Sequence, residues 1–97
     1  MAKFIIYMDA ENISLDEQKK LNEQLSEIGY YTVTTNNADN KRYILPVYEY
    51  HYEGNINNLD VIVDNFVELV KKLTKKYEIS AHEVVDSRYR GLKEYIT

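Results

Sequence analysis

Residues 58–77 read NLDVIVDNFVELVKKLTKKY and carry an amphipathic pattern. Apolar residues recur there at spacings of three and four, the repeat that places side chains along one side of a helix. Asn57 and Asn58 are suitable N-cap residues, and lysines crowd the last turn, where they interact favourably with the helix dipole. We therefore predict a helix over 58–77 that covers a small sheet with this stripe: Leu59, Ile62, Val63, Phe66, Val70, Leu73 and Tyr77.

The start of the chain predicts a strand followed by a helix. Residues 3–9, KFIIYMD, hold a continuous apolar run, which is typical of an interior strand. Ser14 and Glu17 have the spacing of a capping box, and Gly29 is placed to end the helix in a left-handed conformation. We expect a central first strand and a helix over 14–28 with this apolar stripe: Leu15, Leu21, Leu25 and Ile28.

The middle of the chain predicts a hairpin. Residues 30–35, YYTVTT, are β-branched and aromatic, and the polar residues 36–41 indicate a turn. Residues 42–53, RYILPVYEYHYE, form the second strand, and Pro46 lies within it. Because proline donates no hydrogen bond to a sheet, this position predicts either a bulge, which we favour, or an edge strand.

A final strand is predicted over residues 83–90, EVVDSRYR, after a connection over 78–81. Ser80 and Glu83 also have capping-box spacing, so a short helical turn before that strand stays an alternative. We expect the tail over 92–97 to fold back onto the body. The order βαββαβ predicts one α+β domain over residues 1–97, a ferredoxin-like antiparallel sheet with both helices on one face.

Composition limits the classes of function. The chain has 97 residues, a net charge of -4 and no cysteine. The acidic balance argues against a protein that binds duplex nucleic acid mainly through phosphates, and the lack of cysteine excludes disulfides and thiolate metal sites. The opening apolar run is too short for a signal peptide, and we expect a soluble, cytoplasmic protein with no membrane partner.

The end of the first strand carries a first candidate site. Asp9 closes the strand and Asn12 follows three residues later. This pattern resembles the first motif of NYN-type nucleases of the PIN-like group, and the resemblance implies a divalent metal held by acidic residues, with Asp86 as the second carboxylate. The alternative, which we favour, is that Asp9 and Asn12 shape the loop into the first helix through local hydrogen bonds.

The two histidines offer little chemistry. His51 alternates with Glu49 and Glu53, so that three possible ligands share one face of a strand, but an exposed sheet face explains this pattern better. His82 has no partner at metal-ligand spacing. The chain contains no nucleophile elbow and no glycine-rich phosphate loop. We therefore expect no enzymatic activity, no metal and no cofactor.

Ten tyrosines make up most of the aromatic content, and three of them alternate along one strand. Tyr48, Tyr50 and Tyr52 share one face at period two, and a bulge at Pro46 would bring Tyr43 to the same face. On an open sheet face these rings would form a partner-binding platform for a protein or, as the second choice, for single-stranded nucleic acid. Alternatively the rings shield the sheet or pack beneath the C-terminal tail.

Size, tyrosine content, mild acidity and the absence of cysteine together are similar to those of small phage-encoded inhibitors, anti-CRISPR proteins among them. The resemblance implies a small non-catalytic module that binds and inhibits a host or defence protein. A single-stranded nucleic-acid-binding domain and a metal-dependent nuclease are the alternatives. The sequence predicts no oligomeric state.

Overall fold

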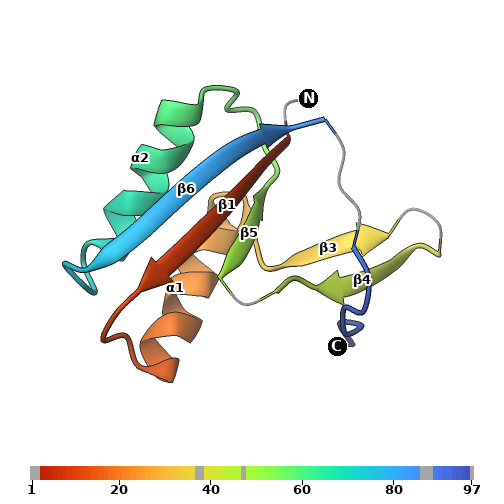
Figure 1. Ribbon diagram of the computed structural model, residues 1–97, viewed down its shortest axis with the longest axis horizontal. Helices are drawn as coiled ribbons and strands as arrows, with labels where there is room; N and C mark the ends of the chain where they lie inside the picture. The colour runs from red at the N-terminus through yellow and green to blue at the C-terminus, as the bar shows by residue number, and fades with distance from the viewer. Residues whose placement is uncertain (1–2, 37–38, 47, 86–88, 97) are drawn as a thin grey trace.

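The computed structural model describes residues 3–36, 39–46, 48–85 and 89–96. They form two helices and six strands, and four of the strands lie between the two helices in sequence (Figure 1). In chain order they are β1 (Lys3–Ala10), α1 (Leu15–Glu27), β2 (Tyr30–Tyr31), β3 (Val33–Asn36), β4 (Lys41–Ile44), β5 (Glu49–Tyr52), α2 (Leu59–Val70) and β6 (Tyr77–Val84).

The main sheet has four strands in the order β2-β5-β1-β6, and every neighbouring pair is antiparallel. β1 lies in the interior, as its apolar run predicts. Its pairing with β6 continues without a break from Lys3 opposite Val84 to Ala10 opposite Tyr77. β6 and the two-residue strand β2 therefore form the two edges of this sheet.

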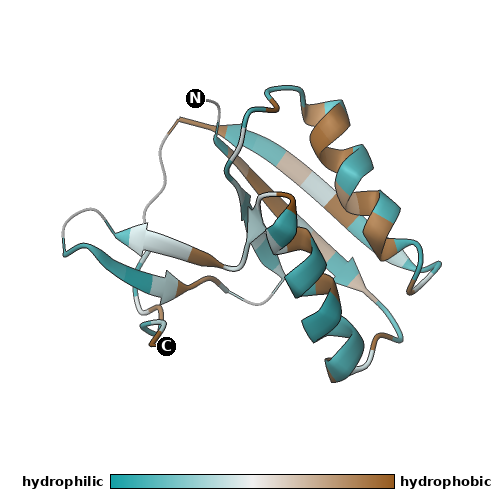
Figure 2. Cartoon of the chain, turned by 180° about the vertical axis from the view of Figure 1, so that it is seen from behind, coloured by the Kyte–Doolittle hydropathy of each residue, from teal (hydrophilic) through white to brown (hydrophobic). Residues whose placement is uncertain are grey.

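Both helices pack on the same side of the main sheet (Figure 1), and Figure 2 shows the brown, apolar stretches of α2 and β1 from that side. Burial of the apolar stripe of each helix drives this packing, since exposed apolar surface is costly in water. The structure confirms the capping box of α1, in which Glu17 N donates to Ser14 Oγ at 3.1 Å. The core cluster consists of Phe4, Ile6, Met8, Leu21, Leu25, Tyr30, Tyr50, Tyr52, Ile62, Phe66 and Val70.

A second, separate sheet contains only β3 and β4. It stands out beside the main sheet, and the C-terminal segment runs along β4 (Figure 1). Ile44 N donates to Lys93 O and Tyr95 N donates to Arg42 O, each at 2.8 Å, so the tail pairs with β4 through an isolated bridge between Tyr43 and Glu94. We call this unit, residues 33–36, 41–44 and 93–95, the arm. The expected hairpin and the returning tail are both present in it.

The predicted α+β class is confirmed, but the element order differs from βαββαβ by the arm strands. Thr32 interrupts the predicted strand over 30–35, and its two halves enter different sheets. The predicted strand over 42–53 is likewise wrong as a single element: it splits into β4 and β5, and Pro46 lies exposed in the connection between them. Neither a bulge nor an edge strand is needed, because a connection tolerates a missing amide donor.

The long helix ends earlier than predicted. α2 stops at Val70, and the side chain of Thr74 accepts a hydrogen bond from Lys76 N at 3.1 Å in the turn that follows. Such a local bond competes with helix continuation. Tyr77 belongs to β6, as do Ser80 and Glu83, so the alternative of a short helical turn is wrong. The last strand begins and ends earlier than predicted, and residues 86–88 of the predicted strand lie outside the described residues.

Within the helix stripes, three residues are misassigned, and one of them is Ile28, which is 46% exposed at the end of α1. Leu15 is 90% exposed at the first turn of α1, and Leu59 is 40% exposed at the first turn of α2. Leu21, Leu25, Ile62, Phe66 and Val70 are buried as predicted.

Candidate functional site

The face of the main sheet opposite the helices carries polar and charged side chains. Alternation places Phe4, Ile6 and Met8 in the core, and therefore places Ile5, Tyr7 and Asp9 on the other face. The register adds residues of the neighbouring strands: Glu49 lies opposite Tyr7, His51 lies opposite Ile5, and Ser80 and Glu78 lie opposite Tyr7 and Asp9 on the other side.

The predicted tyrosine platform does not form. Tyr50 and Tyr52 are 1% and 4% exposed and belong to the helix-covered core, so neither ring is available to a partner. Tyr50 packs edge-on against Phe66, with ring centroids 5.0 Å apart. Its hydroxyl donates to Asn22 Oδ1 at 2.5 Å and accepts from Gln18 Nε2 at 2.8 Å. Hydrogen-bonded hydroxyls allow tyrosine to fill a core position at little cost.

The other two predicted partner-binding tyrosines are accessible but lie apart. Tyr48 is 47% exposed and has a φ of 70°, a left-handed conformation that precedes β5. This turn breaks the period-two pattern, so Tyr48 leaves the face of Tyr50. Tyr43 lies on the arm, where its hydroxyl donates to Asp39 Oδ2 at 2.5 Å. The Asp39 carboxylate raises the pKa of this hydroxyl.

The open face is the face of the main sheet opposite the helices. Part of it is occupied by a cluster of buried polar side chains. Glu49 and His51 are 6% and 3% exposed, so the prediction of an exposed face at these residues is wrong. Tyr89 covers them: its hydroxyl lies 2.6 Å from His51 Nε2 and donates to Glu49 Oε2 at 2.7 Å. His51 Nε2 lies 3.1 Å from the same carboxylate oxygen. These contacts attach the C-terminal segment to the sheet.

Burial lowers the pKa of His51 below its ordinary value of 6.5, although the Glu49 carboxylate opposes this effect. Burial disfavours the charged form of the imidazole, and this effect outweighs the attraction of the Glu49 carboxylate. Sequence alternation identified Glu49 and His51 as neighbours. No sequence signal pointed to Tyr89, which is 38 residues away from His51.

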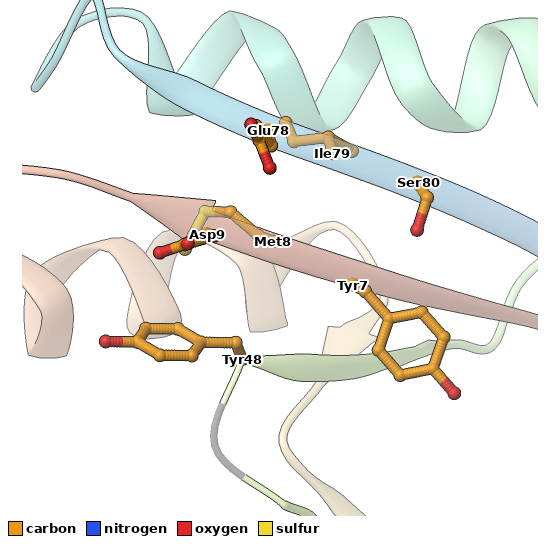
Figure 3. Close-up of a pocket in the computed structure, with 7 residues that line it drawn as sticks. All are labelled: Tyr7, Met8, Asp9, Tyr48, Glu78, Ile79 and Ser80. Atoms are coloured by element: carbon orange, nitrogen blue, oxygen red, sulfur yellow. The ribbon is translucent and has the colours of Figure 1, made fainter.

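Beside this cluster the open face is hollowed into a groove of about 490 Å³ that lies over β1 and β6 (Figure 3). Tyr7 and Tyr48 lie along one side of the groove, and Glu78 and Ser80 come from β6. Partial burial and the nearby Glu49 carboxylate raise the pKa of Tyr7. Asp9 and Glu78 are direct cross-strand partners, and carboxylates in that position repel each other.

The nuclease resemblance gains no second ligand here. Asp9 does end β1, but Asn12 takes a left-handed φ of 63° in the loop to α1, as a turn-forming asparagine does. Asp86, the suggested second carboxylate, lies outside the described residues. Among the residues that the structure describes, Asp9 makes no ion pair.

The arm presents a different surface. Its register places Arg42, Ile44 and Tyr95 on one face, with Val33 opposite Ile44. Ile44 and Tyr95 are 43% and 39% exposed, and the Arg42 guanidinium carbon lies 5.3 Å from the centre of the Tyr95 ring. We call these four residues the arm face.

No helix of the described residues is long and apolar enough to cross a membrane. Within the same part of the chain, no group of three or more metal-ligating side chains gathers. The chain matches no family model, no curated protein and no solved structure.

Proposed function

We propose that this chain is a small non-catalytic module that binds a protein partner through the arm face. The observation that carries the proposal is the position of Arg42, Ile44 and Tyr95 on one exposed face of a ribbon that stands out from the domain. Arginine and tyrosine are enriched among the residues that contribute most to interfaces. An outlying ribbon also reaches a partner surface without moving the core.

Charge indicates which partner surface fits. The described arm and the adjacent tail carry four cations, Lys41, Arg42, Arg90 and Lys93, against the carboxylates Asp39 and Glu94, whereas the whole chain has a net charge of -4. The arm is therefore a basic projection on an acidic protein. An apolar patch rimmed by acidic side chains complements Ile44 and Arg42 together, and such complementarity favours encounter in the right orientation.

The buried cluster does not contribute to the proposed binding surface. His51 and Glu49 lie beneath Tyr89 and are closed to a large partner. The single-stranded nucleic-acid alternative keeps one specific observation in its favour: the basic side chain of Arg42 lies over the ring of Tyr95. Proteins that bind single strands combine basic side chains with aromatic rings on which bases stack. It requires affinity that falls steeply with salt, because phosphate contacts release counterions.

The test uses two variants that differ only in the face they alter. Ile44→Asp places a charge on the arm face, and Thr34→Asp places the same charge on the opposite face of the same hairpin. Tagged chains capture partners from a bacterial lysate, and calorimetry with the purified partner measures affinity. We expect Ile44→Asp to weaken binding at least about tenfold and Thr34→Asp to leave it nearly unchanged.

Two results would overturn the proposal. Equal losses in both variants would show that the arm face does not make the contact. Salt-sensitive binding to mixed single-stranded oligonucleotides, lost in Arg42→Glu, would instead favour the nucleic-acid alternative.

The specific form of this function that we favour is a phage-encoded inhibitor of a host or defence protein, of the anti-CRISPR kind, acting in the cytoplasm. Small size and a cysteine-free composition support it. We also propose that the main sheet and its helices are a ferredoxin-like unit into which the arm hairpin is inserted. The order β2-β5-β1-β6, together with the two helices on one face, supports that relation.

A further inference from the structure

β6 is an unusually long exposed edge. It spans eight residues, Tyr77–Val84, pairs with β1 on one side only, and has no other strand beside it among the described residues. By contrast, the opposite edge of the sheet, β2, has two residues. A long edge strand offers a row of unpaired backbone groups that another strand can pair with.

The backbone groups that face outward can be assigned. Glu11 N donates to Lys76 O at 3.0 Å, and this pair continues the register of β1 with β6. Hydrogen-bonded pairs alternate along an antiparallel ladder, so the even-numbered residues of β6 bond to β1. The N–H and C=O groups of Tyr77, Ile79, Ala81 and Glu83 therefore point away from the sheet.

Several devices that protect an edge are missing, although Glu78 and Glu83 are charged. Residues 77–84 read YEISAHEV and contain no proline, lysine or arginine. The pairing with β1 runs through all eight residues without a bulge, so the strand is not twisted away from an approaching strand. Val85, directly after the strand, is fully exposed.

We propose that β6 pairs with β6 of a second copy of this chain, antiparallel and centred on Ser80, to join two four-stranded sheets into one. A two-fold axis perpendicular to the sheet relates the copies, so both pairs of helices lie on the same side. In this register Ile79 is opposite Ala81, and both have outward-facing backbone groups. Ser80 is opposite its own copy. This association is separate from the proposed partner binding, since the arm does not take part.

Charge complementarity selects this register. It places Glu78 of one copy opposite His82 of the other, twice, on the open face of the joined sheet. Within one copy Glu78 lies opposite Asp9, a repulsive pair, and makes no ion pair among the described residues. His82 of the second copy supplies a hydrogen-bond donor at this carboxylate. Glu83 falls opposite Tyr77, so no two carboxylates face each other across the seam.

The helix side of the seam is apolar. Tyr77, Ile79 and Ala81 already pack, partly buried, against the core cluster. Pairing two edges covers their remaining exposed surface with the same residues of the second copy. Such a seam is smaller than a standard protein interface, so we expect dimers at protein concentrations of about 0.1 to 1 mM.

A cysteine cross-link tests the register. Opposed Ser80 residues would form a pair without backbone hydrogen bonds, with Cα atoms about 4.5 Å apart, within the range that a disulfide spans. Because the chain has no cysteine, Ser80→Cys introduces the only thiol. Under mild oxidation, we expect Ser80→Cys to form covalent dimers roughly ten or more times faster than Ser26→Cys, a control on the exposed surface of α1.

A charge exchange tests the cross-strand pairs, with sedimentation equilibrium as the readout. His82→Glu places two carboxylates opposite each other and should weaken the dimer at least about fivefold. Adding Glu78→Lys to that variant restores an opposite-charge pair, and we expect the dimer to recover. Ala81→Pro removes an outward N–H but leaves the β1 ladder intact, and should leave monomers that keep a native circular dichroism spectrum.

The proposal fails if the unmodified chain stays monomeric over the whole concentration range. It also fails if Ser80→Cys and Ser26→Cys cross-link at equal rates, or if the double exchange remains as weak as His82→Glu alone. The cross-linking result stands independently of Ala81→Pro, should that variant not fold. Because the arm variant Ile44→Asp leaves β6 unaltered, failure of the arm proposal and failure of this one can be told apart.

Discussion

Tyrosine in this protein serves the core as much as the surface. Tyr30 packs against Tyr52 and Phe66, and Tyr50 packs against Phe66. The ring centroids in these pairs are 5.0 to 5.5 Å apart. Each buried hydroxyl has a partner, as when Tyr30 donates to Ile62 O at 2.7 Å. Burial raises the pKa of Tyr30 and of Tyr50 to about 12. High tyrosine content is therefore compatible with a conventional packed interior.

Replacing Tyr50 tests this interpretation at one residue. We expect Tyr50→Ala to lower the free energy of unfolding by about 3 to 5 kcal/mol, because it removes a buried ring. Tyr50→Phe keeps the ring and should cost about 1 kcal/mol, since Gln18 and Asn22 each lose their hydrogen bond to the hydroxyl. Urea denaturation measures both. Tyr48→Ala, at an exposed position, is the control, and an equal loss there would contradict the burial of Tyr50.

His51 gives stability a dependence on pH. Its pKa is lower in the folded protein than the ordinary value of 6.5, mainly because of burial. The unfolded chain therefore binds a proton first as pH falls, and the stability present above about pH 6.5 is lost as pH falls toward the folded pKa. We expect the urea midpoint to fall from about pH 8 to pH 5, and to fall less in His51→Gln. The same decline in both proteins would exclude His51 as the cause.

At the level of elements, α2 organises the main sheet. Its apolar residues contact the core, whereas Glu68 is exposed and pairs with Lys71 at 2.8 Å. We expect Phe66→Ala to lower the free energy of unfolding by about 3 to 5 kcal/mol. Glu68→Ala should have little effect, because exposed pairs contribute little. Similar small changes in both variants, measured by denaturation, would remove α2 from the centre of the fold.

The arm depends on the tail, since a two-stranded ribbon alone is only marginally stable. Lys93 and Tyr95 add hydrogen bonds to β4, and the Tyr95 ring lies beneath Arg42. We expect removal of residues 92–97 to speed amide exchange in β3 and β4 while β1 keeps its protection. Hydrogen exchange followed by NMR measures this, and unchanged arm protection would contradict the role of the tail.

For the whole molecule, two sheets of unequal size imply two levels of local stability. β1 is buried and paired on both sides, whereas the arm rests on few buried contacts, chiefly Leu45 beside β4. Regions with few buried contacts open at lower free energy than the core. We expect amides of the arm to exchange roughly a hundredfold or more faster than those of β1 in the full chain. Equal protection in both regions would mean that the arm unfolds only with the core.

Local pattern was sufficient for features that involve neighbouring residues. Ser14 and Glu17 predicted the start of α1, the spacing of Ile62, Phe66 and Val70 predicted the buried side of α2, and the apolar run of β1 predicted its interior position. Each depends on hydrogen bonds within one turn or on a repeat within one element. The predicted helix ran past the observed end of α2. The alternation of Tyr77, Ile79 and Ala81, which indicates a strand, directly follows the helical repeat, and the sequence does not mark where one pattern gives way to the other.

Tertiary structure alone decided the sides and partners of strands. Alternation placed Tyr50 and Tyr52 on one face and Glu49 and His51 on the other, but which face the helices cover depends on contacts with α1 and α2, far away in sequence. The division of residues 42–53 between two sheets depends likewise on pairing with β1 and with β3. Period two identifies residues that share a face and carries no information about what covers that face, because burial is a property of the assembled chain.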